Sequence, residues 1–200
     1  KLMPLLGYTL GDIKNASVIN DDILAVDLKQ LAAREFKDMP FRVVANLPYY
    51  ITTPIINKVI SEVCIDEMII MVQKEVGDRF KAKPGTKDYN SLSVFLQYYF
   101  DIEKVVLVSK NSFIPRPKVD SIVVKFTRKK ELLYVKDEEM FFKFVRDSFK
   151  QKRKNLRNNL REYDLIKLEN ALKKVNKDLT YRAEQMSLED FVSVFNECNK

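Results

Sequence analysis

The chain has 200 residues, of which 46% are hydrophobic, with a formal net charge of +7 and an isoelectric point near 9.2. This length suits one domain with at most a small appendage, and the excess of lysine and arginine over acidic residues suggests a polyanionic partner. The absence of histidine removes the usual general base and the commonest metal ligand, and no apolar run is long enough to span a bilayer. Cys64 and Cys198 lack metal-ligand spacing. We therefore expect free thiols, a cytoplasmic location, and neither a metal nor a membrane partner.

The apolar pattern predicts alternating helices and strands over the first 130 residues. We expect helices over 2–10, 28–36, 53–63, 73–82 and 91–100, and strands over 17–20, 41–46, 68–72, 105–108 and 121–126. In the third helix, Thr53 is the expected N-cap and Pro54 the first helical residue. This order predicts an α/β fold with a mostly parallel sheet and a late hairpin.

The composition shifts after Lys130 to a charged, helical pattern without a convincing strand. Helices are expected from Glu138 onward, over 165–175, and after Ser187, where a capping-box pattern begins. We therefore divide the chain into an α/β domain, residues 1–130, and a small all-helical domain, residues 131–200.

The predicted strand 41–46 ends in a segment that combines several binding groups. Asn46, Leu47, Pro48 and Tyr49 combine an amide, backbone carbonyls beside a residue without an N–H, and a flat ring. Two acceptors, the Asn46 side-chain oxygen and the Leu47 carbonyl, would hold both hydrogens of a nucleobase amine and direct its lone pair outward. Tyr49 would stack on the base, as enzymes that modify bases require. The alternative is a plain strand-to-helix turn, because Asn and Pro are turn residues.

The segment also carries a family resemblance. Residues 46–55 read Asn-Leu-Pro-Tyr-Tyr-Ile-Thr-Thr-Pro-Ile and resemble the signature of the ribosomal RNA small-subunit adenine dimethyltransferases (the KsgA/RsmA family). Three further blocks match in the same order: residues 20–24, Asn-Asp-Asp-Ile-Leu; residues 113–121, Phe-Ile-Pro-Arg-Pro-Lys-Val-Asp-Ser; and residues 149–156, Phe-Lys-Gln-Lys-Arg-Lys-Asn-Leu. The resemblance covers essentially the whole chain.

The resemblance implies a Rossmann-like methyltransferase fold with a helical RNA-binding domain. It implies an enzyme that uses S-adenosylmethionine to dimethylate N6 of adjacent adenines in small-subunit (16S) ribosomal RNA during ribosome biogenesis. By resemblance, Asp22 and Ile23 contact the cofactor and Asn46 lies between cofactor and substrate. Tyr49 and Phe113 would hold the target adenine from opposite faces. For Asp22 and Phe113, an ordinary Asx turn and a core anchor are the alternatives.

Basic residues recur every three or four positions in the second domain. They are Lys143, Arg146, Lys150, Arg153, Lys154, Arg157 and Arg161, and they would share one side of a helix if that helix is continuous. Asp147 is the only acid among positions 140–161. Side chains of the same charge at these spacings repel one another, and binding to a phosphate backbone would relieve that repulsion. We therefore interpret these residues as an RNA-binding surface that Arg116 and Lys118 extend. The alternative is a solvated surface.

The family's opening strand, glycine-rich cofactor loop and following acid have no counterpart here, since none of the four glycines forms a Gly-x-Gly loop. We therefore expect a fragment, monomeric apart from association through exposed strand edges, with impaired cofactor binding. Two alternative functions stay open. One is a macrolide-resistance-type methyltransferase of large-subunit RNA, and the other is an RNA-binding module without activity.

Overall fold

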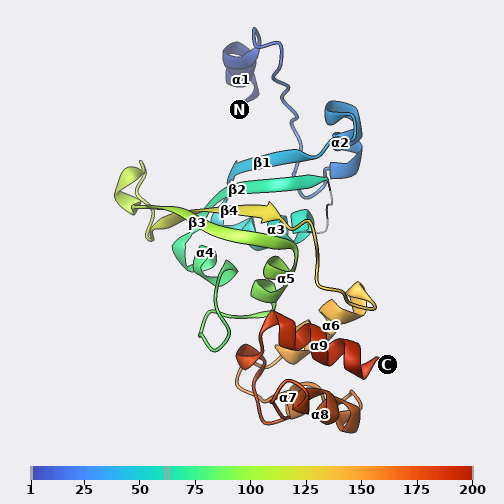
Figure 1. The fold of residues 1–200 in the computed structure, drawn as a ribbon. Helices are drawn as coiled ribbons and strands as arrows, with labels where there is room; N and C mark the ends of the chain where they lie inside the picture. Colours follow the sequence, from blue (N-terminus) through green and yellow to red (C-terminus); the bar gives the residue numbers. More distant parts are fainter. Residues whose placement is uncertain (1, 61, 63, 200) are drawn as a thin grey trace.

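The computed structural model describes residues 2–60, 62 and 64–199. Its centre is a four-stranded sheet of order β1-β2-β4-β3 (Figure 1). The strands are β1 (Phe41–Asn46), β2 (Ile65–Gln73), β3 (Phe100–Val108) and β4 (Ser121–Arg128). The pair β1/β2 is parallel, whereas β4 runs antiparallel to both β2 and β3. The predicted late hairpin of β3 and β4 is therefore confirmed, and it places β4 beside β2. The expectation of a mostly parallel sheet is wrong for the described strands, because β4 returns antiparallel between β2 and β3 and leaves β1/β2 as the one parallel pair among them.

One face of this sheet is covered by helices. Met68, Ile70 and Val72 alternate along β2 and are buried, as expected for side chains that point to the same face of a strand. The helices that pack there are α3 (Thr52–Ile60), α4 (Lys74–Phe80) and α5 (Ser91–Tyr99), preceded in the chain by α2 (Leu28–Phe36). On the outer strand β1, Val44 is 77% exposed. Because β1 is the terminal strand in the sheet order, its outer edge has no strand partner among the described residues.

The C-terminal part is helical, as predicted. It contains α6 (Glu138–Ser148), α7 (Leu156–Asn159), α8 (Leu165–Lys173) and α9 (Leu188–Cys198). Ser187 caps α9 through the predicted box with Asp190. These helices enclose a second apolar cluster, to which α5 contributes Val94 and Tyr98, while Leu96 of the same helix belongs to the cluster under the sheet. Helix α5 thus contributes side chains to both apolar cores.

The predicted strand over residues 17–20 is absent from the described chain. Val18 and Ile19 are 40% and 46% exposed, and the segment forms no ladder. A strand needs a paired neighbour, and none of the four strands lies beside this segment. Helix α1 (Met3–Leu10) forms as predicted but buries no residue, and it lies apart from the sheet (Figure 1).

The start of α3 also differs from the prediction. A short 3-10 helix over Tyr49–Ile51 leads directly into α3, which begins at Thr52. The Thr52 hydroxyl donates to the Pro48 carbonyl at 3.1 Å, so the chain is already helical at Thr53. The expected N-cap at Thr53 is therefore wrong, because the turn after the strand starts the helical conformation earlier than the Thr-Pro pattern indicates.

Candidate active site

The Asn46 segment lies at the carboxyl end of β1. Asn46 is paired in register with Met71 of β2, and the Leu47 N–H donates to the Met71 carbonyl at 3.2 Å. The Leu47 side chain is 8% exposed, which anchors this point of the chain in the core. Asn46 itself is exposed, and its side chain has no hydrogen-bond partner among the described residues. Its carboxamide is therefore available to a ligand at the end of the sheet where open α/β folds bind them.

Tyr49 follows at the start of the 3-10 helix and is half-buried, whereas the next ring, Tyr50, is 85% exposed. The Ile51 N–H donates to the Pro48 carbonyl at 3.2 Å and closes the turn. The sequence therefore folds Pro48 and Tyr49 into a fixed turn.

Phe113 belongs to the loop that joins β3 to β4. The loop begins with a 3-10 turn over Lys110–Ser112, and Phe113 is half-buried. Asp120 closes the loop, because its carboxylate accepts from the Lys110 N–H at 2.9 Å and its carbonyl accepts from the Lys74 N–H at 3.0 Å. Both ends of the Phe113 loop are thereby attached to the sheet.

A hydrogen bond connects the two segments. The Tyr49 hydroxyl lies 2.7 Å from Oγ of Ser121, the first residue of β4. Ser121 is paired in register with Gln73 at the end of β2 and with Val108 at the end of β3. The structure therefore brings Tyr49 to the base of the Phe113 loop. Ser121 lies within the block that resembles the family, but no sequence pattern indicated its contact with Tyr49.

Asp22 and Ile23 lie in an exposed turn before α2. One Asp22 carboxylate oxygen accepts from the Leu24 N–H at 2.9 Å, and the Asp22 carbonyl accepts from Ala25 N–H at 2.8 Å. Asp22 thus forms the Asx turn named as its alternative role. Lys58 of α3 donates to the Leu24 carbonyl at 2.8 Å, which attaches the turn to the helix that follows Tyr49.

The basic residues do not lie on one continuous helix. Helix α6 ends at Ser148, and α7 begins at Leu156, capped by Asn155. The Asn159 amide donates to the Ser148 carbonyl at 2.7 Å and so takes up an acceptor at the end of α6. The condition for a single stripe is therefore not met, because a side chain from α7 stops the helix.

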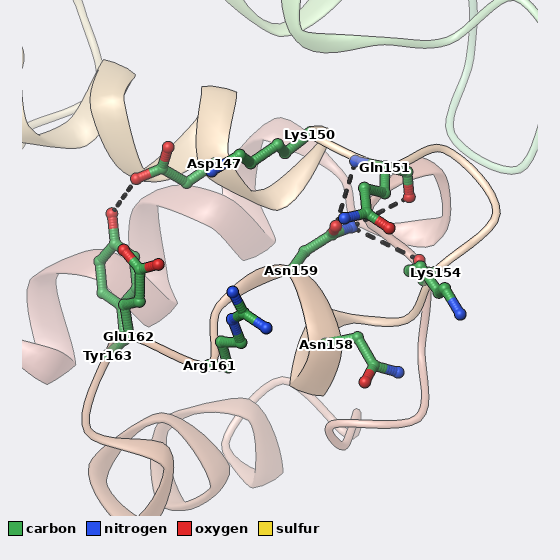
Figure 2. A pocket seen from close by; sticks show the side chains of 9 residues that line it. All are labelled: Asp147, Lys150, Gln151, Lys154, Asn158, Asn159, Arg161, Glu162 and Tyr163. Carbon is green, nitrogen blue, oxygen red and sulfur yellow. Dashed lines mark hydrogen bonds between the residues drawn. The ribbon is translucent and has the colours of Figure 1, made fainter.

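All seven cations are exposed, but their surroundings differ. Lys143 pairs with Asp147 at 2.9 Å, and the Arg146 guanidinium lies 5.6 Å from the Phe95 ring centre. Arg153 and Arg157 lie on the exposed turn and on α7. The other three line a cavity of about 260 Å³ together with Asp147, Gln151, Asn158, Asn159, Glu162 and Tyr163; these cations are Lys150, Lys154 and Arg161 (Figure 2).

Asp147 lies at one side of this cavity. Burial alone would raise the pKa of its carboxyl group, but hydrogen bonds from Tyr163 and Lys143 outweigh burial and the net shift is downward. The Tyr163 hydroxyl donates to Asp147 at 2.7 Å, and Figure 2 shows this pair beside Arg161. The lining thus has three cations against two acids, Asp147 and Glu162, and Lys143 pairs with Asp147 as well, which leaves the cavity with a surplus of positive charge.

Arg116 and Lys118 lie in the exposed loop between β3 and β4. Lys118 lines an open groove of about 490 Å³ in which four lysines are balanced by four acids: Lys74, Lys87, Lys110 and Lys118 against Glu75, Asp78, Asp88 and Asp120. Neither Arg116 nor Lys118 is among the residues that line the cavity of the helical part.

Within residues 2–60, 62 and 64–199, no three histidine, cysteine, aspartate or glutamate side chains come together as a metal site. In the same residues, no helix has the length and apolar character needed to cross a membrane.

Comparison with known protein families matches residues 1–200 to Ribosomal RNA adenine dimethylase. The chain belongs to this family. Among curated dimethylase relatives, it is 43% identical over 203 residues to Ribosomal RNA small subunit methyltransferase A of Clostridioides difficile, covering 99% of this chain and 70% of that protein. The Bacillus mycoides protein of the same name is 42% identical over 205 residues, covering 98% and 70%.

Solved structures support the methyltransferase fold. The 23S rRNA methyltransferase ErmE superposes with a TM-score of 0.73 at 24% identity, over 100% of this chain and 78% of that one. A dimethyladenosine transferase from Plasmodium falciparum gives 0.74 at 23% identity, over 98% and 76%. The Rossmann-like fold expected from the sequence is thereby confirmed, and the family identifies the chain as an adenine dimethylase of ribosomal RNA.

Proposed function

We propose that this dimethylase acts on N6 of adjacent adenines in small-subunit ribosomal RNA and uses S-adenosylmethionine as methyl donor. The observation that carries the proposal is the exposed Asn46 carboxamide at the end of β1, three residues before Tyr49, whose hydroxyl is attached to the base of the Phe113 loop. The names of the bacterial relatives, which specify the small subunit, support the choice of RNA.

In this reading, Asn46 and the Leu47 carbonyl accept the two N6 hydrogens of the target adenine. Holding both hydrogens reduces delocalisation of the nitrogen lone pair into the ring and directs it outward. Tyr49 and Phe113 stack on the base and keep it out of the RNA helix. Catalysis is then mainly positioning, because the sulfonium of the methyl donor would become a neutral thioether as the methyl group passes to N6, which needs no metal, and N6 would release one proton for each methyl group gained.

The residues that would hold the cofactor are Asp22, Ile23 and Asn46. Asp22 fits this role in part, because only one of its carboxylate oxygens is used by the Leu24 N–H. Ile23 is 38% exposed beside it and offers an apolar surface for a purine ring. The 200 residues contain no Gly-x-Gly loop. We therefore assign cofactor binding within this sequence to Asp22, Ile23 and Asn46.

RNA binding is assigned to the basic residues of the second part, with Arg116 and Lys118 nearer the active site. We propose that residues 1–130 carry the chemistry and residues 131–200 bind RNA, in a monomer that meets ribosomal precursors in the cytoplasm. Exposed lysines and arginines make phosphate contacts that are independent of sequence, which suits a surface that orients a large RNA.

The test is Asn46→Ala in the protein expressed from its full reading frame. Methyl transfer to isolated small subunits should fall by at least about 100-fold, as for loss of one preorganised hydrogen-bonding group in other active sites. RNA affinity should stay within a factor of about two, because Asn46 adds no phosphate contact. The matched control is Asn57→Ala, which changes an exposed asparagine of α3 and should leave turnover intact.

Unchanged turnover of Asn46→Ala would refute the catalytic role. Assays with purified small and large subunits as acceptors separate the proposal from its large-subunit alternative, which predicts transfer to the large subunit only. An inactive wild-type protein that binds RNA but no S-adenosylmethionine in calorimetry would favour the non-catalytic alternative.

A further inference from the structure

Ser121 is a buried polar side chain with a specific partner in the active site. Its exposed fraction is 0%, and its hydroxyl lies 2.7 Å from the hydroxyl of Tyr49, 72 positions earlier in the chain. Either oxygen can donate this hydrogen bond. Burial of a hydroxyl is unfavourable unless it has a partner, so this contact is the one that compensates the Ser121 hydroxyl.

The backbone of Ser121 is held on both sides. Its register partners are Gln73 on β2 and Val108 on β3, so three strands meet at this residue. The preceding residue, Asp120, accepts from the N–H groups of Lys74 and Lys110. The serine hydroxyl therefore occupies a fixed position relative to the sheet.

Tyr49 is consequently fixed at both ends of its side chain. Its backbone lies in the 3-10 turn that follows Pro48, and its hydroxyl is attached to Ser121. The ring between these two points is half-buried and presents its remaining surface outward. A ring held in this way has already lost the rotational freedom that stacking on a base would otherwise remove.

We propose that Ser121 is a positioning residue for methyl transfer, which orients the Tyr49 ring for stacking on the target adenine. The inference rests on the proposed function, because it assigns Tyr49 to the base. The same serine begins β4 directly after the loop that carries Phe113. One strand end therefore determines both the orientation of Tyr49 and the point where the Phe113 loop returns to the sheet.

The experiment compares Ser121→Ala, Tyr49→Phe and the double variant in the full reading frame, with small subunits as acceptor. Each single variant removes the same hydrogen bond and keeps an aromatic ring. We expect kcat to fall by about 3- to 10-fold in each, with KM for the RNA and affinity for S-adenosylmethionine within about twofold of the wild type. The double variant should be no slower than either single variant, because both remove one interaction.

Ser93→Ala is the matched control for loss of a buried serine hydroxyl. Ser93 of α5 is also 0% exposed, and its Oγ donates to the carbonyl of Arg79 in α4 at 2.6 Å. This control should lower the melting temperature and leave kcat unchanged. A purely structural Ser121 would behave in the same way, and that result would overturn the inference.

Additive losses in the double variant would also overturn it, because Ser121 would then act independently of Tyr49. These outcomes are distinct from failure of the proposed function. A wild-type protein without methyl transfer refutes the function itself, whereas an active wild type with a fully active Ser121→Ala refutes only the positioning role.

Discussion

At the scale of single residues, Gly77 shows how closely helix α4 approaches the sheet. A Cβ added at Gly77 would lie 2.3 Å from Cγ2 of Ile122 and 3.2 Å from Cγ2 of Val124. Both neighbours are β-branched residues of β4 and are buried, so neither can rotate away without disturbing the strand. A glycine in the middle of a helix is unfavourable by itself, and here close packing requires it.

Gly77→Ala is therefore expected to lower the free energy of unfolding by about 1–3 kcal/mol, because overpacking outweighs the better helix propensity of alanine. Urea unfolding followed by circular dichroism measures the change. Gly7→Ala in α1 is the matched control, since nothing lies within 4 Å of its added Cβ. That variant should be at least as stable as the wild type, because alanine favours the helix and meets no clash there, and equal losses in both would contradict the packing explanation.

At the scale of elements, the connection between α6 and α7 depends on one amide. Asn159 donates to the carbonyls of Ser148 and Gln151 at 2.7 and 3.2 Å and accepts from the Gln151 N–H at 3.1 Å. Figure 2 shows this side chain at the centre of the turn that carries Lys150 and Lys154. Carbonyls at the end of a helix are usually satisfied by residues close by in the chain, whereas here a side chain of α7 satisfies the last carbonyl of α6.

Asn159→Ala should lower the free energy of unfolding by about 1–3 kcal/mol, because the carbonyl of Ser148, a buried residue, loses this donor. The adjacent Asn158→Ala is the control, since among the described residues its side-chain amide donates to Asn155 alone, at 2.7 Å on the surface. The control should change stability by no more than about 0.5 kcal/mol. Thermal or urea unfolding measures both, and similar values for the two variants would rule out the special role of Asn159.

At the scale of the whole molecule, carboxylates held by lysines determine how stability varies with pH. Burial alone would raise the pKa of Asp78, but hydrogen bonds from Lys104 and Lys74 outweigh it and the pKa is lowered on folding. The pKa of Asp147 is lowered in the same sense. A carboxyl group with a depressed folded pKa stabilises the fold above its unfolded pKa of about 3.9 and loses that contribution as pH falls through the folded value.

The free energy of unfolding should therefore decrease as pH falls below about 4. Asp78→Asn should be less stable than the wild type at neutral pH and should show a weaker dependence on acid, so that the two proteins converge as pH falls through the lowered pKa of Asp78. Urea titrations at successive pH values measure this. Parallel curves for the two proteins would show that Asp78 does not contribute to acid unfolding.

Charge also acts on the whole molecule through RNA binding, which should weaken as salt rises. Replacing Lys150, Lys154 or Arg161 by alanine should each reduce the slope of log affinity against log salt by about one. Lys143→Ala should reduce it less, because Asp147 already pairs with this ammonium at 2.9 Å. Filter binding at several salt concentrations measures the slopes.

The control for these variants is Lys173→Ala, which removes one exposed positive charge from the last turn of α8. Its slope should equal that of the wild type. Equal effects of all the substitutions would mean that net charge alone governs binding, and the cavity would then have no special part.

Much of the fold could be predicted because the decisive signals are local. The apolar run from Met68 to Val72 and the pattern from Leu28 to Phe36 correspond to a strand and a helix in the structure. The strand expected over 17–20 failed for the opposite reason, since its existence depends on a neighbour that local sequence does not supply. The break after Ser148 likewise depends on Asn159, eleven positions further along the chain.

The sequence by itself determined the family, the α/β and helical composition, and the segment at Asn46, because these depend on residue type and short spacing. Only the tertiary structure decided that Tyr49 meets Ser121, that α5 serves both cores, and that three of the seven cations share one cavity. The physical reason is that such contacts join residues far apart in the chain. Which of these side chains meet is determined by packing and strand register, because local sequence preferences do not act over such separations.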